Sequence, residues 1–283
     1  MSSLRTSDPF TEAAPASDET SARHVRRAEG YHAWVVLFFA ANLGALVLLV
    51  LHHYWTAAWV FFLPAPWYAW QILNSSARGL GPVVTRFKTE TREVWLTIDD
   101  GPHPTSTPAI LDLLDTYKAR ATFFLIGENV QRYPGLVTEI VRRGHTFGNH
   151  THTHPHNRFW CATARQTGNE IDACASALRA TGAGQTCLFR SPVGLKNHSL
   201  HPELAKRGLD LVLWSARGFD TISRNPAKTL ARITANIQPG AILLVHENPH
   251  CPKNQNQLIS MLLMHLDRNR YSCVIPAPET LMR

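Results

Sequence analysis

Cysteine is scarce in this chain, and its distribution argues against a disulfide framework. Only 5 cysteines occur among 283 residues, at positions 161, 174, 187, 251 and 273. An odd number without paired spacing favours a reducing compartment over the oxidising surroundings of secreted proteins. We therefore expect a fold without disulfide cross-links.

Charge is also sparse. Charged residues make up 17% of the chain, with 28 Lys plus Arg against 21 Asp plus Glu. This basic excess suits a protein at an anionic membrane surface. No basic cluster alternates with aromatic residues, so the sequence does not indicate a nucleic-acid partner.

Two segments near the N-terminus lack charge altogether. Residues 1–30 are rich in Ser, Thr, Ala and acids without apolar periodicity, which predicts a disordered tail. Ala33–Leu51 is long enough to span a bilayer as a helix, and a second uncharged run, Trp55–Leu73, contains Pro64 and Pro66. Residues 31–74 are therefore predicted to form a transmembrane helical hairpin, although the prolines also allow a re-entrant or interfacial second segment.

The charges flanking the hairpin predict its orientation. Arginines precede and follow it, whereas the connecting turn at residues 52–54 has no Lys or Arg. The positive-inside rule places the tail and the folded domain in the cytoplasm, on a multi-pass protein of a bacterial-type inner membrane. If the second segment does not span, the domain faces the other side. A cleaved signal peptide is the competing interpretation, but its charged start would be unusually long and its apolar run too extended.

From residue 93 onward, short apolar runs alternate with helical patterns. This alternation predicts a parallel sheet in one domain at 93–283, joined to the hairpin by a linker at 75–92. The expected strands are Glu93–Ile98, Ala121–Ile126, Gly144–Asn149, Cys187–Phe189, Leu209–Leu213, Ala241–Val245 and Ser272–Ile275. The expected helices are Pro108–Tyr117, Pro134–Arg143, Ala164–Ala180, Ala227–Ile237 and Gln255–Leu266.

An acid pair ends the first of these runs. The run is stopped by Asp99-Asp100-Gly101-Pro102, so both carboxylates are expected where a buried strand emerges into a loop. Neighbouring side chains at a strand end point in different directions, so one acid can bind a cation while the other handles a proton. Alone, this tetrapeptide is an ordinary turn sequence.

A histidine run follows the third expected strand. A helical turn from His150 would place His154 on the same face, whereas an extended strand would favour His152 as well. A metal-assisted hydrolase needs metal ligands, which one carboxylate and two histidines can provide. A second carboxylate beside them can act on a proton. A solvated, adventitious metal-binding tract is the alternative.

These two stretches resemble the first two motifs of the NodB-type polysaccharide deacetylases, carbohydrate esterase family 4, which read approximately T-F-D-D-G-P and H-(S/T)-x-x-H. Three further matches follow in the family's order: Phe189–Gly194 (R-x-P-x-G), Trp214–Asp220, and Ile242–His246, an apolar strand ending in L-x-H. The resemblance covers about residues 90 to 250. It implies a distorted (β/α) barrel with its motifs at the C-terminal ends of the strands.

The resemblance also implies roles for matching residues. Asp100, His150 and His154 would bind a divalent metal, usually zinc in this family, with positions left open for water and substrate. Asp99 would be the general base, and His246 the general acid that protonates the leaving amine.

Further residues would support this chemistry. Arg190 would hold the general base as a carboxylate, and Asp220 would polarise the general acid. The backbone amide of Val193 would stabilise the oxyanion. Leu244 would line the acyl pocket, and Trp214 would shape the same wall unless it is plain core.

The fourth motif departs from the family's W-S-x-D-x-x-D-W. Arg217 stands at the first acid position and Thr221 at the second tryptophan. We hypothesise that Arg217 recognises an anionic substrate group such as a phosphate or a uronate, because guanidinium binds such groups bidentately. The alternative is a local ion pair with an acid such as Asp210.

The sequence thus predicts a membrane-anchored, metal-dependent hydrolase that removes an N-acetyl or other small acyl group from an amino sugar in a glycan. A lipid-linked glycan is an attractive substrate because enzyme and substrate would then share one membrane surface. An O-deacetylase or a deformylase of a lipid-linked sugar would use the same chemistry. The competing class is a non-catalytic, membrane-anchored carbohydrate-binding protein, which has no need of an acid, a base and a metal set together.

Overall fold

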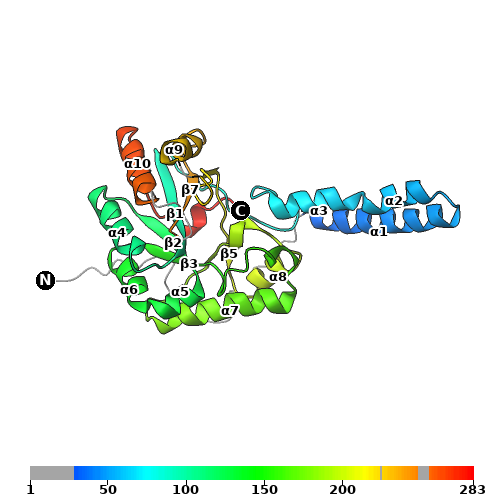
Figure 1. Ribbon diagram of the computed structural model, residues 1–283, viewed down its shortest axis with the longest axis horizontal. Coiled ribbons are helices and arrows are strands. Elements are labelled where there is room, and N and C mark those ends of the chain that lie inside the picture. The colour runs from blue at the N-terminus through cyan, green and yellow to red at the C-terminus, as the bar shows by residue number, and fades with distance from the viewer. Residues whose placement is uncertain (1–28, 224, 248–254) are drawn as a thin grey trace.

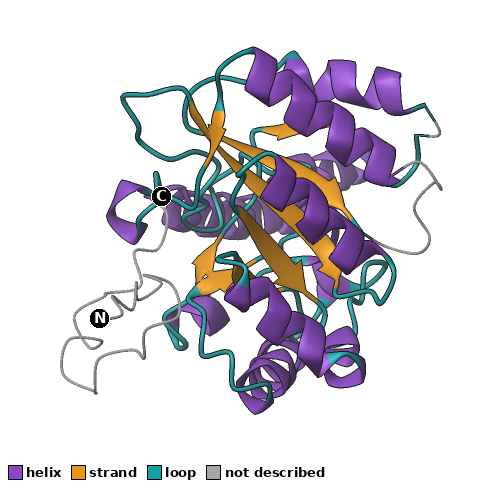
Figure 2. Cartoon of the chain, turned by 90° about the vertical axis from the view of Figure 1, so that its left-hand side faces the viewer, coloured by secondary structure: helices purple, strands orange, loops and turns teal. Residues whose placement is uncertain are grey.

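The computed structural model describes residues 29–223, 225–247 and 255–283. Residues 1–28 of the predicted disordered tail lie outside these residues, whereas Glu29 and Gly30 are helical. Helices surround a curled parallel sheet, which forms a half-barrel (Figures 1 and 2). The strands are β1 (Glu93–Gly101), β2 (Ala121–Leu125), β3 (Thr146–Asn149), β4 (Leu188–Phe189), β5 (Asp210–Leu211), β6 (Ala216–Arg217), β7 (Ala241–His246) and β8 (Ser272–Cys273).

The strand order is β5-β4-β3-β2-β1-β7-β6, with β8 also beside β1. Every pair among these named strands is parallel, so their carboxyl ends meet at one edge. The order explains why β1 carries the longest apolar run. It lies inside the sheet between β2 and β7, and all its residues after Glu93 are buried.

Helices cover the outer face of the sheet (Figure 1). They are α4 (Ser106–Thr116), α5 (Gly127–Arg132), α6 (Pro134–Arg142), α7 (Ala164–Ala180), α8 (Leu200–Ala205), α9 (Pro226–Thr234) and α10 (Gln255–Arg268). The five long helices were predicted from their periodicity. The sequence missed α5 and α8 because six residues are too few to reveal a helical period.

Residues 75–92, which the sequence predicts to be a linker, pack into the folded domain. Val83, Val84 and Phe87 are buried in a core cluster with Trp95 of β1. The amide of Val84 donates to the carbonyl of Leu211 at 2.9 Å, which extends the sheet beyond β5. The segment predicted as a linker is therefore part of the folded domain.

The N-terminal arm, residues 29–73, consists of three helices where the sequence predicted two. They are α1 (Glu29–Val50), α2 (Tyr54–Phe62) and α3 (Pro64–Leu73). Pro64 begins α3, because proline fits the first helical turn but not a helix interior. In Figure 1, α2 and α3 run back along α1. Within the described residues, no helix is both long enough and apolar enough to cross a membrane.

One buried lysine joins the arm to the domain. Lys196 is fully buried, and its Nζ donates to the carbonyls of Asn74 at 2.7 Å and Ala77 at 2.8 Å. Its own amide donates to the carbonyl of Ile72 at 3.3 Å, at the end of α3. Burial lowers the pKa of Lys196 to about 8. The end of the arm is thus fixed to the loop that follows Gly194.

We expect Lys196→Met to loosen this junction. The carbonyls of Asn74 and Ala77 would lose their donor, at about 1–3 kcal/mol for each buried group left unpaired. If local opening costs ~1 kcal/mol less, the open state is about fivefold more populated. Trypsin should then cut after the exposed Arg78 at least about fivefold faster. The measurement is the rate of this cleavage by mass spectrometry.

The matched control is Lys206→Met. Lys206 has a side chain 66% exposed and pairs with Glu203 within the domain, so its loss should leave cleavage at Arg78 unchanged. Equal rates in both variants would contradict a fastening role for Lys196.

Candidate active site

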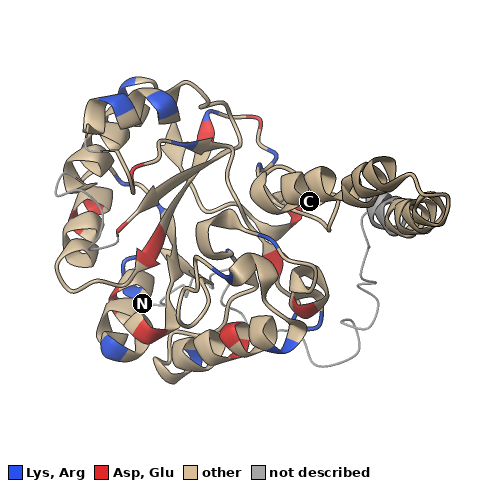
Figure 3. Cartoon of the chain, turned by 45° about the vertical axis from the view of Figure 1, so that its right-hand side comes forward, with Lys and Arg blue, Asp and Glu red and all other residues tan. Residues whose placement is uncertain are grey.

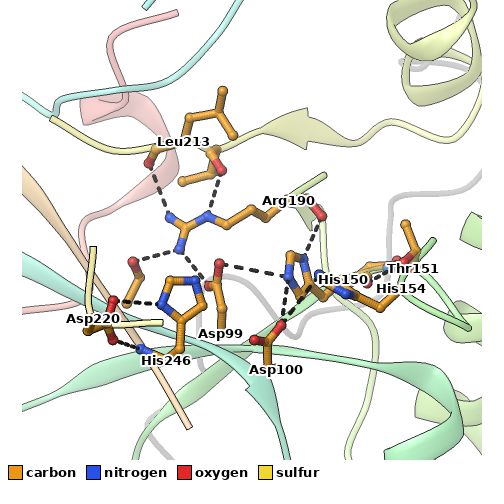
Figure 4. A network of polar contacts seen from close by, with 12 residues as sticks. Asp99, Asp100, His150, Thr151, His154, Arg190, Leu213, Asp220 and His246 are labelled. Atoms are coloured by element: carbon orange, nitrogen blue, oxygen red, sulfur yellow. Dashed lines mark hydrogen bonds and ion pairs between the residues drawn. The ribbon is translucent and has the colours of Figure 1, made fainter. Parts of the chain in front are cut away.

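Polar side chains from five strands meet at the carboxyl edge of the sheet (Figure 4). Asp99 and Asp100 end β1, and His246 ends β7 beside them, with Asp99 in register with His246. His150 follows β3, and Arg190 follows β4. The loop after β6 contributes Asp220. The structure therefore brings together the residues that the sequence placed at separate strand ends.

Asp100, His150 and His154 have the geometry of a metal site. Asp100 Oδ1 lies 3.4 Å from His150 Nε2 and 3.5 Å from His154 Nε2. Ligand atoms around tetrahedral zinc are separated by about 3.3 Å, given bonds of about 2.0 Å. The three ligand atoms all lie within 4.8 Å of one another, so one divalent cation fits between them.

The protonation states of these residues also suit a cation. His150 Nδ1 lies 2.8 Å from the carbonyl oxygen of Arg190, and donation there leaves Nε2 as the free lone pair. Burial and the neighbouring His150 lower the pKa of His154 to about 3. Burial alone would raise the pKa of Asp100, but His150 and His246 hold it well below its usual range. The neutral imidazole of His154, Nε2 of His150 and the carboxylate of Asp100 therefore face one point.

The histidine loop is neither the helix nor the strand that the sequence allowed. Thr151 and His154 have φ angles of 65° and 51°, so the chain turns sharply after β3 and returns the second imidazole to the first. His152 is not a ligand. Its ring lies against Gly127, and its amide donates to Glu170 Oε2 at 2.8 Å. The structure brings His150 and His154 together through this turn, and not through the helical geometry on which the sequence argument relied.

Arg190 holds Asp99 in place. Its Nη1 donates to Asp99 Oδ1 and to Thr97 Oγ1, both at 2.7 Å. The remaining donors reach the carbonyls of Val212 and Leu213, at 2.9 and 3.1 Å. With its guanidinium fully buried and bonded in four directions, Arg190 fixes one oxygen of Asp99. The other, Oδ2, faces His150 Nε2 at 3.8 Å.

His246 and Asp220 form a second coupled pair. Asp220 Oδ1 lies 2.9 Å from His246 Nδ1, and Oδ2 accepts the backbone amide of His246 at 2.8 Å. Burial alone would lower the pKa of His246, but Asp220, Asp100 and Asp99 outweigh it and raise the pKa to about 9. The imidazole is therefore a cation near neutral pH, with Nε2–H free to donate a proton.

A strained residue lies in the third motif. Val193 has φ 57° and ψ 10°, a conformation that β-branched residues rarely adopt. Its side chain is exposed, and within the described residues its amide donates to no other backbone group. Trp214 packs directly on Gly194, and Leu244 is buried in β7. A free amide beside an apolar wall suits a small acyl group.

Glu247 is a buried acid that the sequence did not single out. Both its carboxylate oxygens accept from Thr107 Oγ1, at 3.1 and 2.9 Å, and its side chain packs on Gly101. Burial raises the pKa of Glu247 to about 8 against the effect of these bonds. The only signal in the sequence was an acid immediately after His246, at a strand end.

Comparisons with known proteins show what this chain is similar to. Residues 86–212 match the polysaccharide deacetylase family model. A chitooligosaccharide deacetylase of Bradyrhizobium is 36% identical over 157 residues, 56% of this chain and 71% of the relative. A peptidoglycan-N-acetylglucosamine deacetylase of Bacillus cereus is 30% identical over 206 residues, 72% and 95% of the two chains. The structure of a family 4 carbohydrate esterase from Streptomyces lividans, in complex with acetate, superposes with a TM-score of 0.60, at 29% identity and over 67% and 95% of the chains.

We expect Asp220→Asn to lower the pKa of His246 by at least about one unit, equivalent to ~1.4 kcal/mol, because a neutral amide no longer stabilises the imidazolium. The measurement is an NMR titration of the imidazole in metal-free protein. In the unmodified protein the pKa lies above the ordinary 6.5. Protonation therefore favours the fold below that pH, and the stabilisation is lost as the pH rises through about 9.

The control for this titration is Asp172→Asn. Asp172 lies on α7 and pairs with Arg207 at 2.6 Å, so His246 should titrate as before. A value that stays near 9 in Asp220→Asn would assign the shift to Asp99 and Asp100 instead.

Proposed function

Because this chain belongs to the polysaccharide deacetylase family, and so is a hydrolase of carbon–nitrogen bonds, we propose that it removes the N-acetyl group from an amino sugar in a glycan. The observation that carries the proposal is the placement of Asp99 and His246 beside the Asp100, His150 and His154 cluster. A base, a metal set and an acid then converge on one point.

The chain's residues divide the reaction between them. Asp99 takes a proton from the attacking water while Arg190 keeps its carboxylate in place. The water oxygen bonds to the acyl carbon, and the amide of Val193 donates to the oxyanion that forms. His246 gives its proton to the sugar nitrogen as the carbon–nitrogen bond breaks, which releases acetate and a free amine. Zinc or another divalent cation at the site would polarise the carbonyl and lower the pKa of water.

The test is release of acetate from N-acetylglucosamine oligosaccharides by detergent-solubilised protein. We expect chelation to abolish release and zinc to restore it, because metal removal leaves the water unactivated. Asp99→Ala should lower kcat by about 100- to 10,000-fold, the usual contribution of a general base. Mass spectrometry of the sugar and assay of the released acid provide the measurement.

The same assay separates the competing functions. Formate instead of acetate would identify a deformylase, and loss of acyl groups only from O-acetylated sugars would identify an O-deacetylase. Stoichiometric metal binding with no release from any of these substrates would support the non-catalytic carbohydrate-binding alternative.

The arm favours a substrate held at a membrane. No Asp, Glu, Lys or Arg occurs from residue 33 to residue 77, and Figure 3 draws the arm mainly in tan, the colour of uncharged residues. Trp55 and Trp59 are 85% and 78% exposed, and many apolar residues of α1 are also exposed. So large an exposed apolar surface is typical of a lipid or protein contact. We propose that the arm inserts into a bacterial-type inner membrane and that the glycan substrate is lipid-linked.

We expect the protein to float with lipid vesicles in a density gradient. The double variant Phe39→Asp and Trp59→Asp should lose this binding, because each charge placed in hydrocarbon costs about 2.5–3.5 kcal/mol. The comparison variant is Trp160→Asp, which changes an exposed tryptophan outside the arm and should still float. Equal flotation of all three proteins would contradict insertion of the arm.

Labelling of a surface cysteine on native membranes tests the predicted cytoplasmic side. Cys161 is exposed on the folded domain and reacts with an impermeant maleimide only where the reagent has access. In a background without Cys187 and Cys251, labelling should require inside-out vesicles. Labelling of intact spheroplasts would place the domain on the opposite side, as the alternative topology predicts.

A further inference from the structure

Arg217 lies one strand from the candidate acyl pocket. It ends β6, where it is in register with Leu244 of β7. Its guanidinium carbon lies 4.1 Å from the centre of the Phe219 ring and 5.2 Å from that of Trp214. Trp214 in turn packs on Gly194, next to Val193. The cation is therefore held by aromatic rings at the edge of the site.

No carboxylate in the described part of the chain forms an ion pair with Arg217. Asp210, the local partner that the sequence allowed, binds Arg283 through both oxygens at 2.8 and 2.7 Å. Both oxygens of Asp220 are engaged by His246. The ion pair with Asp210 was a wrong alternative, and the donors of Arg217 remain available to a ligand.

The rings hold this cation in a fixed position. Phe219 has a φ of 59°, which is unusual for an aromatic residue, and the residue is 42% exposed. Stacking restricts the guanidinium before any ligand arrives, so less conformational freedom is lost on binding. A half-buried position also excludes part of the surrounding water, which strengthens attraction to an anion. Burial lowers the pKa of Arg217, and the nearby Asp220 opposes that effect.

We propose that Arg217 is a specificity residue that binds an oxyanion group, a phosphate or a carboxylate, on the sugar being deacylated or on the adjoining sugar. The proposal rests on the proposed deacetylase function. Guanidinium suits this task because its planar fork donates two parallel hydrogen bonds to either anion. A deacetylase with an acid at this position would repel the same group, so the Arg217 substitution changes which glycans are favoured.

The test compares kcat/KM for three substrates of equal length: a neutral N-acetylglucosamine oligosaccharide, one with a phosphomonoester, and one with a uronic acid. We expect the unmodified protein to prefer an anionic substrate. Arg217→Gln should lower the ratio of anionic to neutral kcat/KM by about 10- to 100-fold, as loss of charged hydrogen bonds implies. Arg217→Lys should retain part of the preference, because it keeps the charge without the fork. Phosphate or carboxylate is identified by which ratio falls.

Arg179→Gln is the matched control. Arg179 is exposed on α7 and its side chain donates to Ser176 Oγ at 2.8 Å, so both ratios should stay as in the unmodified protein. Ratios that do not change in Arg217→Gln would overturn the proposal and leave Arg217 as a structural clamp between two rings. Failure of the proposed function gives a different result, because the unmodified protein would then release no acetate from any of the three substrates.

Discussion

The buried contact between Arg190 and Asp99 is the interaction on which the site depends. Arg190 is fully buried, and its donors reach β1 and the segment after β5, while its own carbonyl orients His150. One residue thus fixes the general base and the direction of a metal ligand. Removing one partner of such a buried pair costs about 3–5 kcal/mol, because the other charge is left uncompensated. A substitution of Arg190 or Asp99 would therefore affect both the stability of the fold and the catalytic reaction.

The backbone around this contact is held in conformations that isolated residues disfavour. Asp100, His154 and Val193 all have positive φ, and each such residue costs about 1–3 kcal/mol. The parallel sheet bears this cost, because β1, β2, β3 and β7 are buried along almost their whole length. These unusual conformations occur at strand ends above a rigid core. They place the carboxylate of Asp100, the imidazole of His154 and the amide of Val193 where a regular helix or strand would not.

The sequence predicted what depends on periodicity and motif order, and missed what depends on packing. The helix Ala164–Ala180 agrees at both ends, because seventeen residues with a capping box define its limits. The strand expected at Leu209–Leu213 is only Asp210–Leu211 in the structure, since pairing and not apolar character decides where a strand ends. Acids and histidines at parallel strand ends had to converge, but no local pattern could show that Glu247 packs on Gly101 or that Arg217 stacks on Phe219.

The arm and the oxyanion loop share one attachment point. Lys196 holds the end of α3 through Asn74 and Ala77, and it lies three residues after Val193 in the same loop. A buried lysine with carbonyl partners is rigid, because leaving any of its donors unpaired is costly. Any tilt of the arm would therefore act directly on the loop that carries the Val193 amide. If the arm lies in a membrane, as we propose, the orientation of the membrane-embedded segment and the geometry of the oxyanion donor are set by the same contact.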